Sequence, residues 1–177
     1  MRNLSLALVF CAAFSIGAMA ESSLPALPSD GFVTLEQIVR DFKDKPEAAL
    51  QKYNGLRLCV YGRVGDVAHS EEEAAPLFVR MRLADLAMPS VKAVFDQEDI
   101  PSGAIDVAES DTKASIYHRD WNGDPTRQTS FIIPEKNVAI RGTFDNFVAG
   151  DIILKNSFKL SPEALAQKLA EHGIATE

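Results

Sequence analysis

Residues 56–64 read LRLCVYGRV, a run with a repeat of two that contrasts with the helical spacing before it. The repeat predicts a strand with Leu58, Val60 and Val64 on its buried face. Gly62 falls on the same face, and a glycine inside a strand is typical of the bends that let a small barrel close. This stretch therefore predicts the first strand of a small β-barrel.

The same alternation continues along the chain and predicts strands at residues 77–83, 91–95, 138–144 and 152–160. Five strands with a connecting segment between the third and the fourth are typical of an OB-type barrel. A β-sandwich is the competing architecture, and it would need further strands within residues 100–133. In the long insertion at residues 96–135 we expect one extra hairpin, with residues 114–117 and 129–133 on either side of a polar turn.

Helix signals flank the predicted barrel on both sides. Thr34 and Gln37 fit a capping box at the start of a helix, and Pro46 restarts a helix where its missing N–H costs nothing. Ser161 and Pro162 have the N-cap and first-turn positions of a last helix. The expected fold is mainly β, a five-stranded OB-type barrel with an N-terminal helical segment and a C-terminal helix.

Residues 1–20 have the pattern of a cleaved signal peptide. Arg2 precedes an apolar run, and Ala18 and Ala20 are the small residues before the expected cleavage site. Cys11 does not fit lipoprotein processing, because the bulky Phe10 stands directly before it. We therefore expect a periplasmic or secreted protein that is not a lipoprotein, with a lead-in at residues 21–33 and a single OB-fold domain at residues 34–177.

The charge of the chain bears on its partners. The formal net charge is −7, and the leader holds one cation and no acid, so the chain without the leader carries −8. A net acidic protein is not expected to hold nucleic acid through bulk electrostatics. Without the leader, Cys59 is the single cysteine, which excludes an intramolecular disulfide and is typical of a buried small apolar side chain.

Several short motifs resemble the tRNA_anti-like OB-fold family. They are the segment from Pro46 to Gly55, with its Ala-rich helix and Tyr53, the run from Val60 to Val64, and the late strands 138–142 and 153–157. The resemblance covers about residues 34–160 and implies an OB fold in an exported protein of unknown role. Two departures are Ser157, where members often have cysteine, and an insertion longer than usual.

The alternation also predicts which side chains point away from the core. On the first three strands these are mainly cations and aromatics, a composition that can stack bases and follow phosphates. Trp121 lies in a polar and aromatic segment of the insertion and is a further candidate, although an ordinary turn explains that segment as well. The candidate binding residues are Arg57, Tyr61, Arg63, Phe78, Arg80, Arg82, Lys92 and Trp121.

Three interpretations of these residues remain open. The first is an exported non-enzymatic binding module for a protein, peptide or glycan, with the charges partly solvated or paired within the chain. The second is single-stranded nucleic-acid binding on the same face. The third is a calcium-dependent nuclease recruiting Arg63, Asp66, Arg80 and Glu98, although no spacing requires it.

Neither catalytic nor metal motifs are found in the sequence. It has no Gly-x-Ser-x-Gly, no His-Glu-x-x-His and no phosphate-binding glycine loop. His69, His118 and His172 are isolated and lack partners at ligand spacing, and His172 is expected to interact favourably with a helix dipole. We therefore expect no catalytic residues, no metal and no cofactor.

Overall fold

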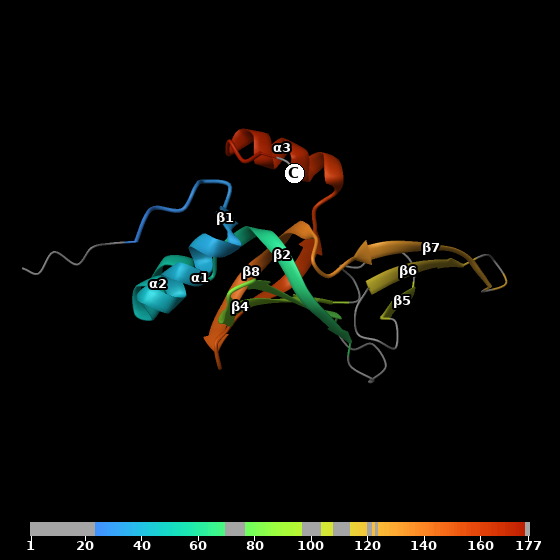
Figure 1. The fold of residues 1–177 in the computed structure, drawn as a ribbon, viewed down its shortest axis with the longest axis horizontal. Helices are drawn as coiled ribbons and strands as arrows, with labels where there is room; N and C mark the ends of the chain where they lie inside the picture. Colours follow the sequence, from blue (N-terminus) through green and yellow to red (C-terminus); the bar gives the residue numbers. More distant parts are fainter. Residues whose placement is uncertain are drawn as a thin grey trace, which may run out of the picture.

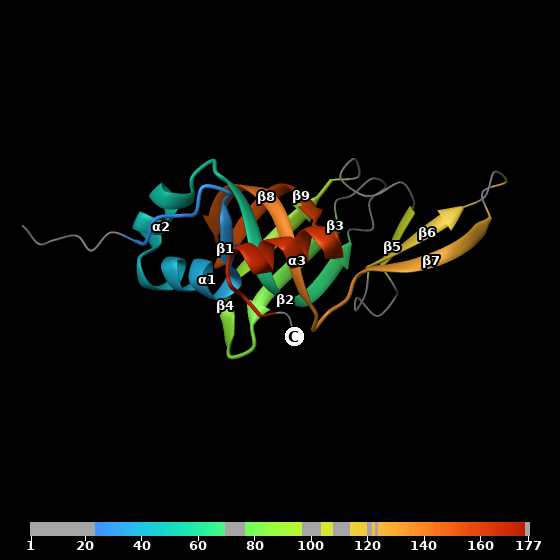
Figure 2. The same cartoon turned by 90° about the horizontal axis from the view of Figure 1, so that it is seen from above.

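The computed structural model describes residues 24–69, 77–96, 104–107, 114–119, 122 and 124–175. A closed, mixed barrel of five strands forms its centre (Figures 1 and 2). The strands are β2 (Arg57–His69), β3 (Leu77–Leu83), β4 (Leu86–Phe95), β8 (Asn137–Val148) and β9 (Asp151–Lys159).

The pairing of these strands is that of an OB barrel. Their order is β2-β3-β4-β9-β8, and β8 pairs back to β2 and closes the barrel. Strands β4 and β9 run parallel, whereas the other four barrel pairings are antiparallel. The predicted fold class is confirmed.

Three helices flank the barrel. Helices α1 (Leu35–Asp44) and α2 (Pro46–Tyr53) lie together at one end, and α3 (Pro162–Glu171) lies across the outside of the barrel (Figure 2). The hydroxyl of Thr34 accepts a hydrogen bond from the Gln37 amide and begins α1 as expected. The Gln37 side chain turns instead to Asp41, so the capping box is not reciprocal.

Two short strands were not expected from the sequence. Strand β1 (Phe32–Thr34) lies at the end of the predicted lead-in and pairs parallel to β2. Strand β5 (Ala104–Val107) joins β6 (Ala114–Arg119) and β7 (Pro125–Ile132) in a second, three-stranded sheet. The predicted hairpin is β6–β7, and its sheet extends away from the barrel in both views (Figures 1 and 2).

The inward-facing positions are those that the alternation predicts. Leu58, Val60 and Val64 are buried in the main core, together with residues of every other barrel strand and of α1 and α2. Gly62 was expected to bend the strand, but the structure gives another reason for a glycine there. A Cβ at residue 62 would lie 2.4 Å from the Leu35 Cβ, so the glycine lets α1 approach the barrel. Among the described residues, none of the helices has the length and apolarity needed to cross a membrane.

A buried carboxylate joins α1 to α2. Asp41 is 3 % exposed and accepts hydrogen bonds from Gln37 Nε2 at 2.6 Å, Lys52 Nζ at 2.7 Å and Tyr53 Oη at 2.7 Å. Burial, together with the neighbouring carboxylate, raises the pKa of Tyr53 far above its usual value. Because all its partners lie on these two helices, Asp41 fixes their relative orientation rather than forming a reactive site.

Candidate functional site: the outer face of the barrel and its cleft

Acids of the same chain engage the cations at the centre of the outer face. Arg80 Nη2 lies 3.1 Å from Asp151 Oδ2, and its Nη1 lies 3.7 Å from Asp66 Oδ1. Arg82 Nη1 lies 3.5 Å from the other oxygen of Asp66. Ser90 donates to the remaining oxygen of Asp151 at 2.5 Å. Asp66 and Asp151 therefore connect the four barrel strands β2, β3, β4 and β9 and offset the two arginines.

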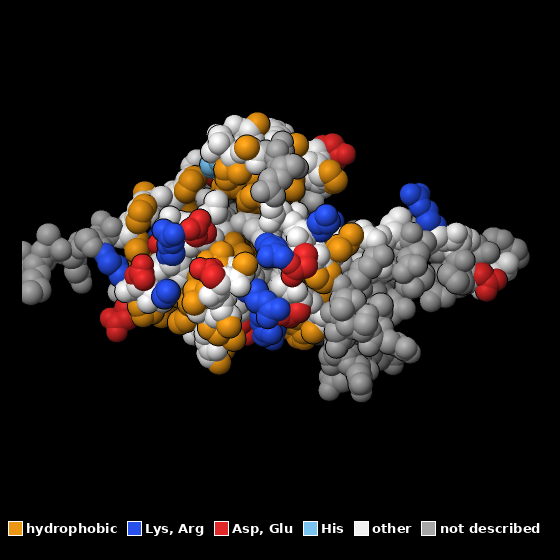
Figure 3. Space-filling model, viewed as in Figure 1, with side chains coloured by type: hydrophobic (Ala, Val, Ile, Leu, Met, Phe, Trp, Pro, Cys, Tyr) orange, Lys and Arg blue, Asp and Glu red, His pale blue; other side chains and the backbone are white. Residues whose placement is uncertain are grey.

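Other predicted cations are occupied by aromatic rings or by a separate acid. Lys92 Nζ lies 4.2 Å from the centroid of the Phe78 ring, on the neighbouring strand. Arg57 lies 5.4 Å from the Phe158 ring. Arg63 forms an ion pair with Glu135. In the face shown by Figure 3, acidic and basic side chains are interspersed over the barrel rather than gathered into a basic patch.

Helix α3 covers one part of the outer face. Tyr61 is half-buried there, next to an apolar cluster, so this ring is not a free stacking platform. Cys59 also points outward and is fully buried in that cluster, as expected for an apolar cysteine. Burial raises the pKa of its thiol, although the nearby Arg141 opposes the effect. Such a thiol is inert as long as α3 stays in place.

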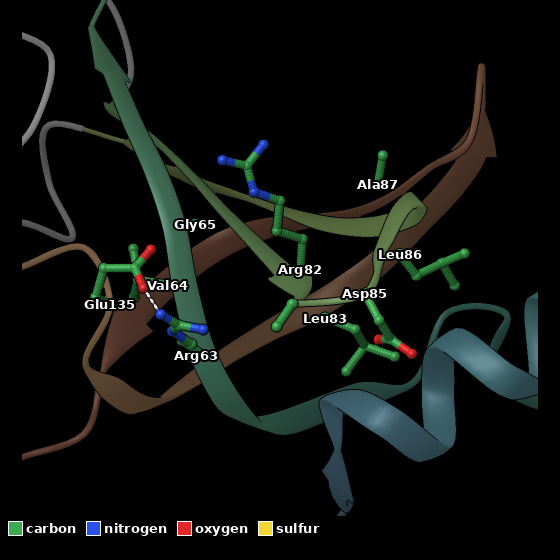
Figure 4. A pocket seen from close by; sticks show the side chains of 10 residues that line it. Arg63, Val64, Gly65, Arg82, Leu83, Asp85, Leu86, Ala87 and Glu135 are labelled. Carbon is green, nitrogen blue, oxygen red and sulfur yellow. Dashed lines mark ion pairs between the residues drawn. The ribbon is translucent and has the colours of Figure 1, made fainter.

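A cleft opens beside this covered region, between β2 and the hairpin that joins β3 to β4 (Figure 4). Its volume is about 490 Å³, and a second hollow of about 380 Å³ adjoins it and shares Arg63, Arg82, Leu83 and Ala84. Figure 4 shows Arg63 turned towards Glu135, while Arg82 rises separately from β3. These two adjoining hollows are together called the cleft, and their lining residues extend from the hairpin to the start of α1.

The cleft exists because of a gap in the pairing of β2. On one side, β8 pairs with residues 57–63 of β2. On the other side, β1 pairs with β2 up to Tyr61 and β3 pairs with it only from Val64 onwards, so no described strand pairs on this edge in between. Of the two residues there, Arg63 turns its main chain to this edge, whereas Gly62 pairs with Val138 of β8. A bulge follows at Gly65, where a Cβ would lie 2.7 Å from the Arg82 side chain.

The lining of the cleft is mixed in character. It combines two arginines, Arg63 and Arg82, with two acids, Asp85 and Glu135, and with apolar side chains such as Leu83. The adjoining hollow adds Glu36, so two cations and three acids line the cleft as a whole. About half of the Arg82 side chain is exposed, at 47 %, and its contact with Asp66 is longer than a hydrogen bond. Arg82 is therefore the cation of this cleft that is most available to a ligand.

The structure unites only part of the predicted site. Arg63 and Arg82 line the cleft, with Tyr61 at one end, whereas Phe78 and Lys92 lie elsewhere on β3 and β4. Arg80 belongs to the acid-paired network and Arg57 to the Phe158 contact. Trp121 lies outside the described residues, as does Glu98 of the nuclease hypothesis.

Sequence reasoning missed the hairpin at residues 83–87 and Glu135. The hairpin carried a weak signal, since Asp85 interrupts two alternating runs. Glu135 gave no signal in the sequence. It lies in the turn between β7 and β8 with a positive φ of 68°, and only this turn brings it beside Arg63. No group of three or more potential metal ligands is present among the described side chains.

Comparison with known proteins assigns neither a family nor a function to this chain. No family model matches the chain, and no curated protein matches it. A crystal structure of a lipoprotein from Klebsiella pneumoniae, provisionally assigned to nucleic-acid binding, is similar at 13 % sequence identity and a TM-score of 0.48, over 73 % of this chain and 91 % of that one. Likeness at this level carries no inference about binding. The resemblance to the tRNA_anti-like family stays a prediction.

Proposed function

We propose that this chain is an exported, non-enzymatic binding module, and that its cleft takes an extended segment of a protein or peptide partner. The gap in the pairing of β2 is the observation that carries the proposal. Main chain at Arg63 lies between the ends of β1 and β3 and lines the cleft, whereas that of Gly62 is paired with β8. Extended peptides bind sheets by pairing with main chain of this kind, and pockets beside it select side chains.

The charge of the face argues against single-stranded nucleic acid. Binding to phosphates requires cations that are free to replace counterions. Here Arg80 is paired with Asp151 and Asp66, Arg63 is paired with Glu135, and Lys92 lies over a ring. Of these three cations and Arg82, only Arg82 is partly available, and one cation is too few to follow a chain of phosphates. A polypeptide needs no excess of positive charge, and an acidic side chain in it would find Arg82 half exposed.

Selection from a phage-displayed library of random linear peptides tests this function. We expect the full chain to enrich peptides whose binding is lost in Arg82→Glu. Arg127→Glu is the matched control, because Arg127 is an exposed arginine on β7, which does not line the cleft. Failure to enrich any peptide, or equal binding to both variants, contradicts the proposal.

A further inference from the structure

Helix α3 is attached to the barrel mainly through side chains. It follows β9 after Leu160 and Ser161, and among its ten residues Leu169 is the buried one. Figures 1 and 2 show it lying outside the barrel as a separate layer. A helix this short is marginal by itself, so its position depends on the contacts that hold it.

Asp30 of the lead-in fastens the C-terminal end of α3. One of its carboxylate oxygens lies 2.9 Å from Lys168 Nζ and 2.9 Å from His172 Nε2, and the other accepts from the Phe32 amide at 3.1 Å. The His172 ring stacks on Phe32 with the centroids 4.2 Å apart. Burial raises the pKa of Asp30, but these hydrogen bonds and the charge of Lys168 outweigh it and hold that pKa well below its usual value.

The surface beneath α3 is apolar and lies on the outside of the barrel. It includes Cys59, Tyr61, Ala139 and Phe158. Because Leu58 and Val60 point inward, Cys59 points outward, and yet its exposed fraction is 0 %. Its burial therefore depends on the cluster that contains Phe32, Leu160 and Leu169.

Ile174, three residues after the end of α3, also reaches the cleft. Ile174 lines the part of the cleft next to Thr34, and it lines the hollow beside His172 as well. Its amide donates to the Leu169 carbonyl at 2.9 Å, so Ile174 is held to the helix. Movement of α3 would carry this wall of the cleft with it.

We infer that residues 162–174 form a latch, fastened at Asp30, which opens while the barrel stays folded, uncovers the apolar surface around Cys59 and removes one end wall of the cleft. Local openings of this kind occur in folded proteins at free energies below that of global unfolding. Opening itself does not require a ligand; regulation of the cleft by the latch rests on the proposed function.

Thiol labelling tests the latch directly. The full chain carrying Cys11→Ser has Cys59 as its single thiol. Its labelling rate, divided by the rate in the urea-unfolded chain at the same pH, gives the fraction of time that Cys59 is exposed. We expect labelling through an opening that depends little on low urea, because the barrel remains folded. Labelling that follows the global unfolding constant over the whole urea range would overturn the latch.

Two variants test whether Asp30 holds α3 in place. Asp30→Asn should speed labelling by about tenfold to a hundredfold, the range expected for loss of hydrogen bonds to a charged group. The matched control is Asp145→Asn, which should leave the rate unchanged, since Asp145 on β8 pairs with Lys155 on β9 at 3.0 Å rather than with a residue of α3. An unchanged rate in Asp30→Asn would overturn the fastening at Asp30. Neither result depends on the peptide selection, so the latch and the proposed function can fail separately.

Discussion

Gly62→Ala tests whether the absence of a side chain at residue 62 is what allows α1 to pack against the barrel. A Cβ at residue 62 would lie 2.4 Å from Leu35 Cβ and 2.9 Å from Leu35 Cδ2. Leu35 is 3 % exposed and is the first residue of α1. Because the closest atom is bonded to the backbone, rotation of a side chain cannot relieve the contact, and α1 has to shift.

Overpacking of this kind costs about 1–3 kcal/mol, and we expect the upper part of that range for Gly62→Ala. Gly65→Ala is the matched control on the same strand, because its Cβ would meet the flexible Arg82 side chain. That variant should cost less than about 1 kcal/mol. Urea unfolding followed by far-UV circular dichroism measures both.

Rescue provides the decisive comparison. Leu35→Gly removes all three atoms nearest the new Cβ, and it carries its own loss of buried surface. Added to Leu35→Gly, the Gly62→Ala change should cost almost nothing, a coupling of about 1–3 kcal/mol. Additive costs, or a Gly62→Ala cost no larger than that of Gly65→Ala, would refute the steric argument.

Two further predictions concern buried and half-buried acids. Asp41→Ala should destabilise the chain by about 3–5 kcal/mol in urea unfolding, because it leaves Lys52 and Tyr53 without their hydrogen-bond acceptor. Asp41→Asn should cost less, because one acceptor oxygen remains, and equal costs of the two variants would contradict this reasoning. The lowered pKa of Asp30 means that its stabilisation is present above the ordinary value of 3.8 and is lost as pH falls through the still lower pKa of the folded state. The difference in unfolding free energy between wild type and Asp30→Asn should therefore shrink in strong acid, and a difference that persists there would contradict the ion pair with Lys168.

The sequence was informative wherever one face of an element is buried. Strands β2, β3, β4, β8 and β9 each bury alternate side chains, and this repeat is visible in the chain. Thr34 and Ser161 were recognised because helix starts use local hydrogen bonds. Strand β1 has three residues and β5 has four, too few for a repeat to show.

Of the site, the sequence predicted which side chains face outward but not what they contact. Arg63 and Arg82 were candidates by alternation, and both line the cleft. The acids that they contact could not be foreseen, because Glu135 meets Arg63 only where β8 closes the barrel against β2, and Asp66 meets Arg82 only through the bulged pairing of β2 with β3. Tyr61 was a candidate for stacking, but α3 covers it through contacts far apart in the chain.

Titration of fluorescently labelled oligo(dT) with the full chain, at low and at physiological salt, tests most directly whether the cations of the outer face are occupied within the molecule. We predict no saturable rise in anisotropy at low salt, because Asp66, Asp151 and Glu135 already offset the arginines. Saturable binding at low salt that weakens steeply as salt is added would show that these cations are free for phosphates, and it would contradict the account.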